Sequence, residues 1–154
     1  VIDIPLIAAG GIGSGKSMFA AMSLGADGVQ IGSRFVTTLE SSAHEYFKNK
    51  IVEAEEGGTK LVLKKIVPVR LIKNEFFKKV EEAEKAGASK EELYNLLGRG
   101  RAKLGMFEGD LEQGELEIGQ VSGMIKSVVS VHQVIVEILN DFNLVSSKMK
   151  GIKL

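Results

Sequence analysis

The first part of the chain alternates between apolar runs and short glycine-rich breaks. Residues 2–9 and 27–32 are nearly continuous apolar runs bounded by glycines, a pattern typical of strands that are buried on both faces. Between them, residues 16–24 are rich in small and apolar side chains and predict a short helix that ends at Gly25. Strand, helix and strand at this spacing predict a βαβ unit with parallel strands.

The middle of the chain predicts a further helix and a strand region. Ser42, with Glu45 three residues later, forms a capping box and predicts a helix that runs to about Glu55. Residues 60–72 contain alternating and β-branched side chains, which predict one or two short strands. Pro68 restricts these strands to edge pairing.

Helices and loops are expected over the next 50 or so residues, about a third of the chain. Asn74 is expected to cap one helix, which ends at Gly87. Ser89 and Glu92 form a capping box for the next helix. Glycines and charges alternate over residues 98–120, which predicts helix fragments and loops.

The last helix has the clearest periodicity. Its apolar positions repeat every three or four residues, which predicts a stripe that faces the core. These positions are Met124, Val128, Val131, Ile135, Ile138 and Phe142. The basic tail after Asn143 is expected to fray.

Net charge and the absence of cysteine bear on which partners and which cellular compartment we expect. The 154 residues carry 20 Lys and Arg against 20 Asp and Glu, so no net field favours nucleic acid or an anionic membrane as a partner. Cysteine is absent, which excludes disulfides and thiolate chemistry and favours a cytoplasmic location. The chain starts with Val1 rather than Met, so we expect either a removed leader or the C-terminal part of a longer protein.

Residues 10–17 match the G-x-x-x-x-G-K-S pattern of a nucleoside-triphosphate P-loop. In such a loop, backbone amides and Lys16 hold phosphate oxygens while Ser17 meets magnesium. P-loop NTPases also hold the magnesium with an Asp, which we expect at the end of a second apolar strand. Here residues 29–32 end in glycine and residues 61–63 run into lysines. The expected Asp is therefore missing, and a P-loop nucleotide-binding protein is kept only as an alternative hypothesis.

A second kind of phosphate site fits both glycine breaks. In (β/α)8 barrels, the loops after the seventh and eighth strands bind phosphate through backbone N–H groups. Gly10 and Gly11 follow the first predicted strand, and Gly32 and Ser33 follow the second. Glycine suits these places because the backbone must approach the phosphate closely. Lys16 is then a solvated residue early in a helix.

Several segments together resemble the nitronate monooxygenase family, formerly called the 2-nitropropane dioxygenase family. This family also contains FMN-dependent enoyl-acyl-carrier-protein (enoyl-ACP) reductases. The segments are residues 8–12, 24–30, 32–35, 40–44 and 114–123. The combination of Gly-Ser-Arg-Phe with Gly-Gln-x-x-Gly is more specific than the Ala-x-Gly-Gly-Ile loop, which many FMN barrels carry. The resemblance spans most of the chain, to about residue 140.

The resemblance implies an α/β fold, the C-terminal part of a (β/α)8 TIM barrel with an inserted small α+β substrate domain. Residues 1–45 correspond to the last two barrel βα units with their phosphate-binding loops. Residues 46–110 correspond to the inserted domain, and residues 111–154 to the return to the barrel and the C-terminal helix.

The resemblance also implies FMN as the cofactor and assigns residues to it. Backbone amides and one hydroxyl bind the FMN phosphate, and a late loop closes near the flavin. The implied cofactor-binding residues are Gly10, Gly11, Gly32 and Ser33 at the phosphate, Gln30 facing the flavin, and Gly119, Gln120 and Ser122 in the late loop. The family's catalytic histidine lies before the seventh strand and has no counterpart here. We therefore expect no catalytic residue in this chain, which alone should be inactive.

The activity implied by the resemblance is that of an FMN-dependent oxidoreductase of the nitronate monooxygenase type, which oxidises alkyl nitronates with O₂. An FMN-dependent enoyl-ACP reductase that uses NAD(P)H is the alternative within the same fold. The implied substrate is a small molecule, either a nitronate or an enoyl thioester. A non-catalytic half-barrel module is an alternative of another class. Two strands cannot close a barrel, and their unpaired edges tend to pair with other strands. We therefore expect a homodimer or pairing with the missing barrel half.

Other polar residues have simpler interpretations. His44 is expected to play a structural, hydrogen-bonding role, and His132 to be partly buried or solvent-facing. Neither histidine has carboxylates or cysteines at ligand spacing, so no metal site is expected. Arg99, Arg101 and Lys103 are expected to form a solvated helix face, with the phosphates of NADPH or an acyl carrier as the alternative partner.

Overall fold

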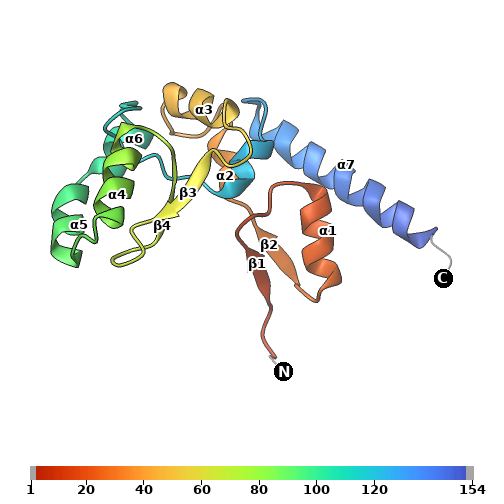
Figure 1. Cartoon of the computed structure of the whole chain (residues 1–154). Coiled ribbons are helices and arrows are strands. Elements are labelled where there is room, and N and C mark those ends of the chain that lie inside the picture. The colour runs from red at the N-terminus through yellow and green to blue at the C-terminus, as the bar shows by residue number, and fades with distance from the viewer. Residues whose placement is uncertain (1–2, 152–154) are drawn as a thin grey trace.

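The computed structural model describes residues 3–151 as two lobes of helices and short strands (Figure 1). In one lobe, β1 (Ile7–Ala9), α1 (Gly15–Ser23) and β2 (Gly28–Gln30) form a βαβ unit. The strands pair in parallel, with Ala8 opposite Val29. The parallel βαβ unit predicted from the two apolar runs is therefore confirmed.

The strands of this unit are more exposed than their apolar sequences predicted. Ile4 is 71% exposed, Leu6 49% and Ile7 52%, and no residue of β2 is buried. The sheet has two strands, so each strand has one neighbour and no barrel closes in the described part of the chain. The predicted burial of residues 2–9 and 27–32 is therefore wrong for this chain, although the first residue of the former range lies outside the described residues.

Helix α7 (Val131–Lys150) lies along α1 and contacts its first turn (Figure 1). Gly15 approaches α7 so closely that an added Cβ would lie 2.1 Å from the carbonyl oxygen of Ile138. The Lys16 amide donates to Asp141 Oδ2 at 2.9 Å. The absence of a side chain at Gly15 therefore sets the distance between the two helices.

Both ends of α7 differ from the predicted last helix. The helix begins after Ser130, whose Oγ accepts a hydrogen bond from the Gln133 amide. Met124, the first position of the predicted stripe, lies before this cap and is 70% exposed. The tail after Asn143 does not fray, because α7 continues in helical form to Lys150.

The predicted stripe on the last helix is also shifted. The positions that α7 buries are Val134 and Ile138, whereas Ile135 is 44% exposed. The prediction for Ile138 is therefore confirmed, whereas Val134 rather than Ile135 lies beside it in the buried face. No helix within residues 3–151 combines the length and apolarity that crossing a membrane requires.

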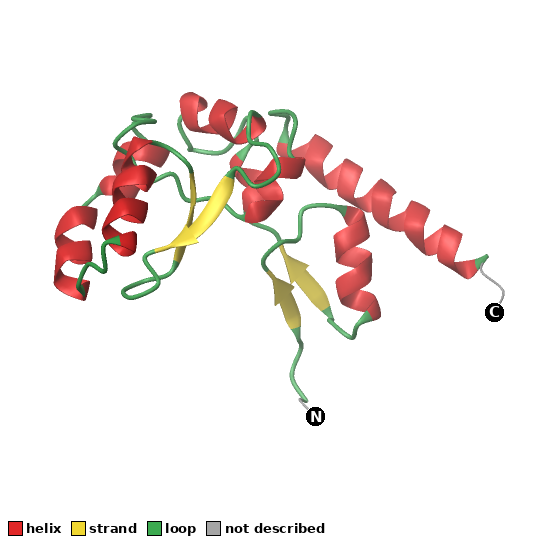
Figure 2. Cartoon of the chain, in the orientation of Figure 1, coloured by secondary structure: helices red, strands yellow, loops and turns green. Residues whose placement is uncertain are grey.

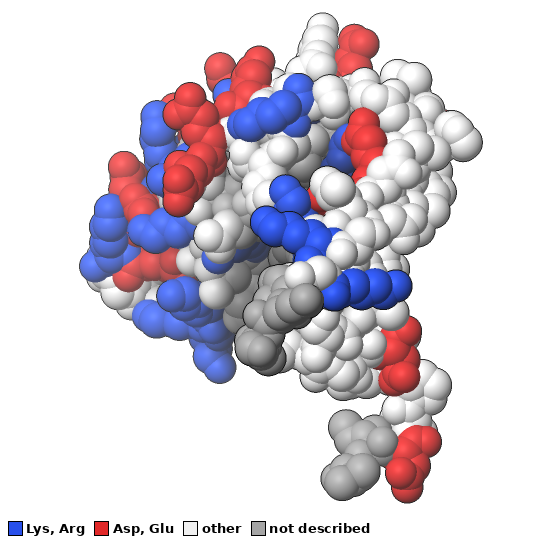
Figure 3. Space-filling model, turned by 90° about the vertical axis from the view of Figure 1, so that its right-hand side faces the viewer, with Lys and Arg blue, Asp and Glu red and all other residues white. Residues whose placement is uncertain are grey.

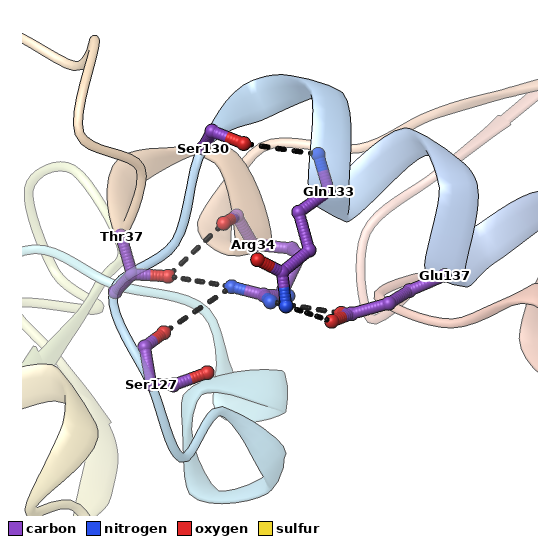
Figure 4. A network of polar contacts seen from close by, with 6 residues as sticks. All are labelled: Arg34, Thr37, Ser127, Ser130, Gln133 and Glu137. Atoms are coloured by element: carbon purple, nitrogen blue, oxygen red, sulfur yellow. Dashed lines mark hydrogen bonds and ion pairs between the residues drawn. The ribbon is translucent and has the colours of Figure 1, made fainter.

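The short helix α2 (Ser33–Val36) follows β2 and is joined to α7 by the buried side chain of Arg34 (Figure 4). The guanidinium donates to Thr37 Oγ1 at 3.1 Å and to the Ser127 carbonyl at 3.4 Å. It also pairs with Glu137 at 3.3 Å. A buried cation is costly without partners, so this network fixes the loop after β2 against the start of α7.

The second lobe consists of a hairpin and three helices (Figure 1). Its elements are β3 (Thr59–Val62), β4 (Val69–Ile72), α4 (Glu75–Lys85), α5 (Lys90–Leu97) and α6 (Arg101–Met106). The hairpin is antiparallel and forms a sheet separate from β1 and β2 (Figure 2). Its core contains Val62, Leu63, Leu71, Phe76, Phe77, Val80 and Leu93.

Two predicted caps in this lobe are confirmed. Asn74 Oδ1 accepts from the Phe77 amide at 2.8 Å and so caps α4. Ser89 and Glu92 exchange hydrogen bonds in the predicted capping box of α5. The loops between these helices therefore follow from local sequence.

Helix α3 (Glu45–Val52) begins later than predicted. Its N-cap is His44, whose Nδ1 accepts from the Tyr46 amide at 3.2 Å. The prediction that Ser42 caps this helix is therefore wrong. The His44 amide donates to the Met106 carbonyl at 2.8 Å, and this long-range bond fixes where the helix starts.

The segment around residues 116–118, which leads back from the second lobe, runs alongside β4. The Ile72 amide donates to the Leu116 carbonyl at 3.0 Å, and the Ile118 amide to the Arg70 carbonyl at 3.1 Å. The 3-10 helix η1 (Gln120–Met124) follows and leads back toward α7. A second core lies beneath this return segment and contains Phe47, Ile51, Ile72, Leu116, Ile118 and Ile125.

Replacing Gly15 with alanine should separate α1 from α7, because the new methyl group would overlap the backbone of α7. We expect the free energy of unfolding to fall by about 3 kcal/mol, as for a tightly overpacked contact. Urea denaturation measures this change. The control is Lys16→Ala, which removes an exposed ion pair and should cost about 1 kcal/mol or less. Equal effects of the two substitutions would contradict the close contact.

Candidate functional site

The two glycine breaks lie at the carboxyl ends of β1 and β2 and line one cavity. Gly10 and Gly11 have positive φ angles of 86° and 71°, which favour glycine. A Cβ added at Gly11 or Gly32 would meet no protein atom within 4 Å, so the space beside these backbones is open. The cavity has a volume of about 250 Å³ and is lined by Ala9, Gly10, Gly11, Ile12, Gln30, Gly32, Ser33, Gly119 and Val121.

Several backbone donors that line this cavity are unpaired. In the described part of the chain, the amides of Gly11, Gly32 and Ser33 donate to no protein acceptor. The Ser33 hydroxyl accepts from the Gly119 amide at 3.0 Å, which joins the late loop to the end of β2. Because a hydroxyl that accepts one bond can still donate another, Ser33 retains a donor for a ligand. We call this lined space the glycine cavity.

The P-loop match of residues 10–17 does not form a phosphate cradle of its own. The amides of Gly13 and Ser14 both donate to Ser17 Oγ. The amides of Lys16 and Ser17 donate to Asp141 and to Ser14 Oγ. These N–H groups, which a P-loop would direct at phosphates, are therefore used within the fold.

The Lys16 side chain lies away from the glycine cavity. Its side chain is 72% exposed and its Nζ lies 3.8 Å from Asp141 Oδ1 on α7. The expectation of a solvated residue early in a helix is confirmed.

The late loop separates the glycine cavity from two larger neighbours. One cavity, of about 480 Å³, is lined by Gly11, Glu56, Gly57, Gln120, Val121, Gly123 and Met124. The other, of about 410 Å³, is lined by Gly32, Ser33, Val36, Pro68, Val69, Arg70, Glu117, Ile118 and Gly119. Gly11 and Gly119 thus each belong to two adjoining cavities.

The structure gathers most of the predicted site residues but not all of them. Gln30 and Gly119 line the glycine cavity with the residues of the two glycine breaks. Gln120 lines the adjoining cavity of about 480 Å³. Ser122 lines none of these cavities; it is buried, and its Oγ has no hydrogen-bond partner.

Sequence reasoning missed two carboxyl groups that the fold removes from solvent, the buried Glu115 and the partly buried Glu117. Burial raises the pKa of Glu115 to about 7, with repulsion from Glu117 adding to the rise and Arg101 opposing it. Burial also raises the pKa of Glu117, which lines the cavity of about 410 Å³. The alternation Glu-Leu-Glu-Ile next to β4 was the available signal, because alternate residues of an extended segment share a face.

The histidines lie outside these cavities. His44 caps α3 and its ring packs against Gly109, where an added Cβ would lie 2.5 Å from Nδ1. The expectation of a structural role is thereby confirmed. His132 is exposed on α7. Within residues 3–151, no group of three or more His, Asp or Glu could hold a metal ion.

The expected solvated basic face is wrong for Arg101. Its guanidinium donates to the Leu97 and Gln113 carbonyls, each at 2.8 Å, and lies over the Phe76 ring at 4.5 Å. Its side chain therefore closes the core of the second lobe. Lys103 pairs with Glu108 at 2.9 Å, and Arg99 is exposed.

A parallel βαβ unit with open glycine backbones at the ends of both strands is the arrangement at which α/β proteins bind phosphate groups. The sequence profile described as nitronate monooxygenase matches residues 1–141. The chain therefore belongs to the nitronate monooxygenase family, and the resemblance of its glycine segments is confirmed. This family is FMN-dependent.

Known proteins agree with this assignment. A probable nitronate monooxygenase of Staphylococcus saprophyticus is 43% identical over 84 residues, which are 53% of this chain and 23% of that protein. FabK from Thermotoga maritima is 38% identical with a TM-score of 0.89, over 97% of this chain and 48% of that one. A nitroalkane oxidase from Streptomyces ansochromogenes is 26% identical with a TM-score of 0.76, over 96% of this chain and 42% of that one. This chain thus spans about half the length of these solved relatives.

The residues of the glycine cavity fit the phosphate group of FMN. A phosphate accepts several hydrogen bonds, and the unpaired amides of Gly11, Gly32 and Ser33 can supply them. No side chain fills the space beside Gly11 and Gly32. Arg34 cannot contribute its charge, because its guanidinium is bound to Thr37 and Glu137.

Replacing Ser33 with alanine should release the late loop, because the Gly119 amide loses its acceptor. A hydrogen bond that contributes about 1 kcal/mol corresponds to about fivefold faster exchange of that amide. Hydrogen exchange followed by NMR measures the change. Ser33→Thr, which keeps the hydroxyl, and Ser41→Ala, which removes a serine elsewhere, should leave the exchange of Gly119 unchanged.

The stability of the fold should fall as pH rises through the range of Glu115. Its pKa is about 7 in the folded state against 4.5 ordinarily, so between these values the folded state binds the extra proton. The unfolding free energy then decreases with rising pH, by at most about 3 kcal/mol. Urea denaturation from pH 5 to 8 should show a flatter profile for Glu115→Gln. The exposed neighbour control Glu112→Gln should keep the original slope.

Proposed function

We propose that this chain carries the FMN-phosphate site of an oxidoreductase of the nitronate monooxygenase type. The observation that carries this proposal is the glycine cavity, in which open glycine backbones and unpaired amides lie at the carboxyl ends of two parallel strands. Ligands of α/β proteins bind in this position. Family membership supplies the identity of the phosphate compound as FMN.

Each group of residues has a defined task in this proposal. The amides of Gly11, Gly32 and Ser33 bind the phosphate, and the Ser33 hydroxyl donates to it while it accepts from Gly119. Gln30 lines the same cavity and contacts the flavin-bearing side of the cofactor. Bound FMN supplies the redox chemistry that no side chain can perform.

The cavity lined by Gly11 and Gln120 is the space toward which the rest of the cofactor and the substrate extend. It is larger than the glycine cavity, at about 480 Å³, and adjoins it at Gly11. No histidine of the described residues lines the cavities named above. In the family that the chain resembles, the catalytic histidine lies before the seventh strand, and we assign the catalytic base to that part of the family's barrel.

The proposed reaction is the oxidation of an alkyl nitronate with O₂. The match of the nitronate monooxygenase profile to residues 1–141 supports it, as do curated relatives named probable nitronate monooxygenase. The second candidate is FMN-dependent reduction of an enoyl thioester by NAD(P)H. The high structural similarity to FabK, which belongs to the enoyl-ACP reductases, favours this candidate.

The phosphate site predicts that the chain distinguishes FMN from riboflavin, which lacks the phosphate. Titration followed by flavin fluorescence should give an FMN affinity at least about tenfold higher, since each 1.4 kcal/mol of phosphate contacts is worth that factor. Gly32→Val should remove this preference, because its side chain would occupy the open space beside Gly32. The matched control is Gly151→Val, at a glycine of negative φ at the end of α7.

Equal affinities for FMN and riboflavin would contradict the proposal. ATP binding that is lost on Lys16→Ala would instead favour the P-loop alternative. The two candidate reactions differ in their substrates, so oxygen consumption with an alkyl nitronate and oxidation of NAD(P)H with an enoyl thioester separate them once a complete barrel is assembled.

A further inference from the structure

Helix α3 carries a lysine whose charge is removed from water. Lys48 is 8% exposed, and its Nζ donates to the carbonyl oxygens of Thr38 and Ser41, each at 2.7 Å. Lysine is almost never fully buried unless it is paired, yet among residues 3–151 Lys48 forms no ion pair with a carboxylate. Within this part of the chain, carbonyl dipoles therefore take the place of a counter-ion.

The glycine cavity supplies hydrogen-bond donors without a positive charge. Among the described residues that line it, none has a charged side chain, although a phosphate monoester carries about 1.5 to 2 negative charges at neutral pH. The molecule as a whole does not attract anions either, because it has 20 Lys and Arg against 20 Asp and Glu. On the face shown in Figure 3, basic side chains lie among acidic ones. A positive charge that balances the phosphate would therefore have to lie just behind the lining of the cavity.

Residues 33–41 connect Lys48 to that lining. Ser33, which lines the cavity, is the first residue of α2, and α2 has four residues, a length of about 6 Å at about 1.5 Å for each residue. Thr38 lies just beyond the other end of α2, where its carbonyl accepts from Lys48. The Thr38 hydroxyl donates to the Phe35 carbonyl at 2.8 Å, which fixes this end of the segment to α2. The Lys48 ammonium is thus separated from Ser33 by little more than the length of α2.

The two charged side chains of this segment have partners of their own. Arg34 pairs with Glu137 at 3.3 Å (Figure 4). Glu40 is exposed, and its carboxylate accepts from the Val131 amide at 2.9 Å. Neither side chain therefore neutralises the buried charge of Lys48, which remains available to act on an anion in the glycine cavity.

We propose that Lys48 is a positioning residue that makes the glycine cavity prefer a doubly charged phosphate group. Its two hydrogen bonds hold the segment that begins with Ser33, and its charge attracts the phosphate through the protein interior without touching it. This inference rests on the proposed function, because the ligand that it concerns is the phosphate of FMN. It adds a residue of α3 to a site whose other members lie in the βαβ unit, at the start of α2 and in the late loop.

The expected size of the effect follows from the short separation. Two unit charges about 10 Å apart, in a medium with an effective dielectric constant of about 20, attract strongly enough to change a binding constant about tenfold. The same attraction lowers the pKa of a phosphate by about one unit, because the doubly charged form gains more than the singly charged form. Riboflavin lacks the phosphate and gains nothing. An effect of charge is therefore distinguishable from a loss of packing, which would weaken the binding of both flavins.

The test compares two substitutions at Lys48 in the 154-residue chain. Lys48→Gln keeps a side-chain donor for the carbonyls and removes the charge, whereas Lys48→Arg keeps the charge. Flavin fluorescence should show that Lys48→Gln lowers the preference for FMN over riboflavin about tenfold, and ³¹P NMR should show that the bound phosphate titrates about one pH unit higher. Lys48→Arg should retain both values. The matched control is Lys50→Gln, which removes a partly exposed charge of α3 and should change neither.

Urea denaturation shows whether the Lys48→Gln chain stays folded. If it does not, the wild-type chain decides, because the ¹⁵N resonance of the Lys48 side chain should shift on addition of FMN and stay in place on addition of riboflavin. A resonance that ignores FMN would overturn the proposal, as would a folded Lys48→Gln chain with unchanged flavin preference and phosphate titration. Equal weakening of FMN and riboflavin would overturn it too, since a merely structural lysine would have that effect.

Failure of this inference is separate from failure of the proposed function. If the wild-type chain binds FMN and Lys48 contributes nothing, the function stands and the inference falls. If the chain binds no flavin, inorganic phosphate becomes the probe. Phosphate-dependent shifts of the Gly32 and Ser33 amides, with an affinity that Lys48→Gln lowers about tenfold, would then support the inference without FMN. Amides that do not respond to phosphate would overturn both.

Discussion

The contact between the first turn of α1 and the backbone of α7 is the constraint on which the site depends. Gly15 allows the helices to approach, and Asp141 then takes the Lys16 amide. The amides of the neighbouring turn are used internally by Ser14 and Ser17. In this loop, the backbone of Gly10 and Gly11 therefore remains available to a ligand. It lies beside the second glycine break, Gly32 and Ser33, at the end of β2. A sequence that matches a P-loop thus leaves a different set of backbone donors free, because Ser14, Ser17 and Asp141 occupy the amides that a P-loop would use.

Local sequence predicted much of the fold correctly. The caps at Asn74 and Ser89 rest on interactions within a few residues, and the βαβ unit joins two strands that follow each other along the chain. Most of the candidate site residues also lie together around one cavity, because the carboxyl ends of parallel strands meet at one edge of a sheet. Their contact with FMN remains a prediction. The family resemblance was recovered from the same short segments.

The features that sequence reasoning missed depend on partners far along the chain. His44 rather than Ser42 caps α3 because Met106 fixes its amide. The Arg101 side chain is drawn away from solvent because its guanidinium donates to the Leu97 and Gln113 carbonyls and lies over the Phe76 ring. The apolar strands are exposed because burial needs neighbouring strands, which periodicity alone does not supply. The burial of Glu115 and the partial burial of Glu117 likewise follow from the pairing of their segment beside β4.

We propose that the phosphate of FMN binds in the glycine cavity and not at the P-loop match. Backbone amide NMR of the chain during titration with FMN tests it most directly. Binding in the glycine cavity should give the largest chemical-shift changes at the amides of Gly11, Gly32, Ser33 and Gly119. The largest changes on the amides of residues 13–17, with those of Gly32 and Ser33 unmoved, would contradict it.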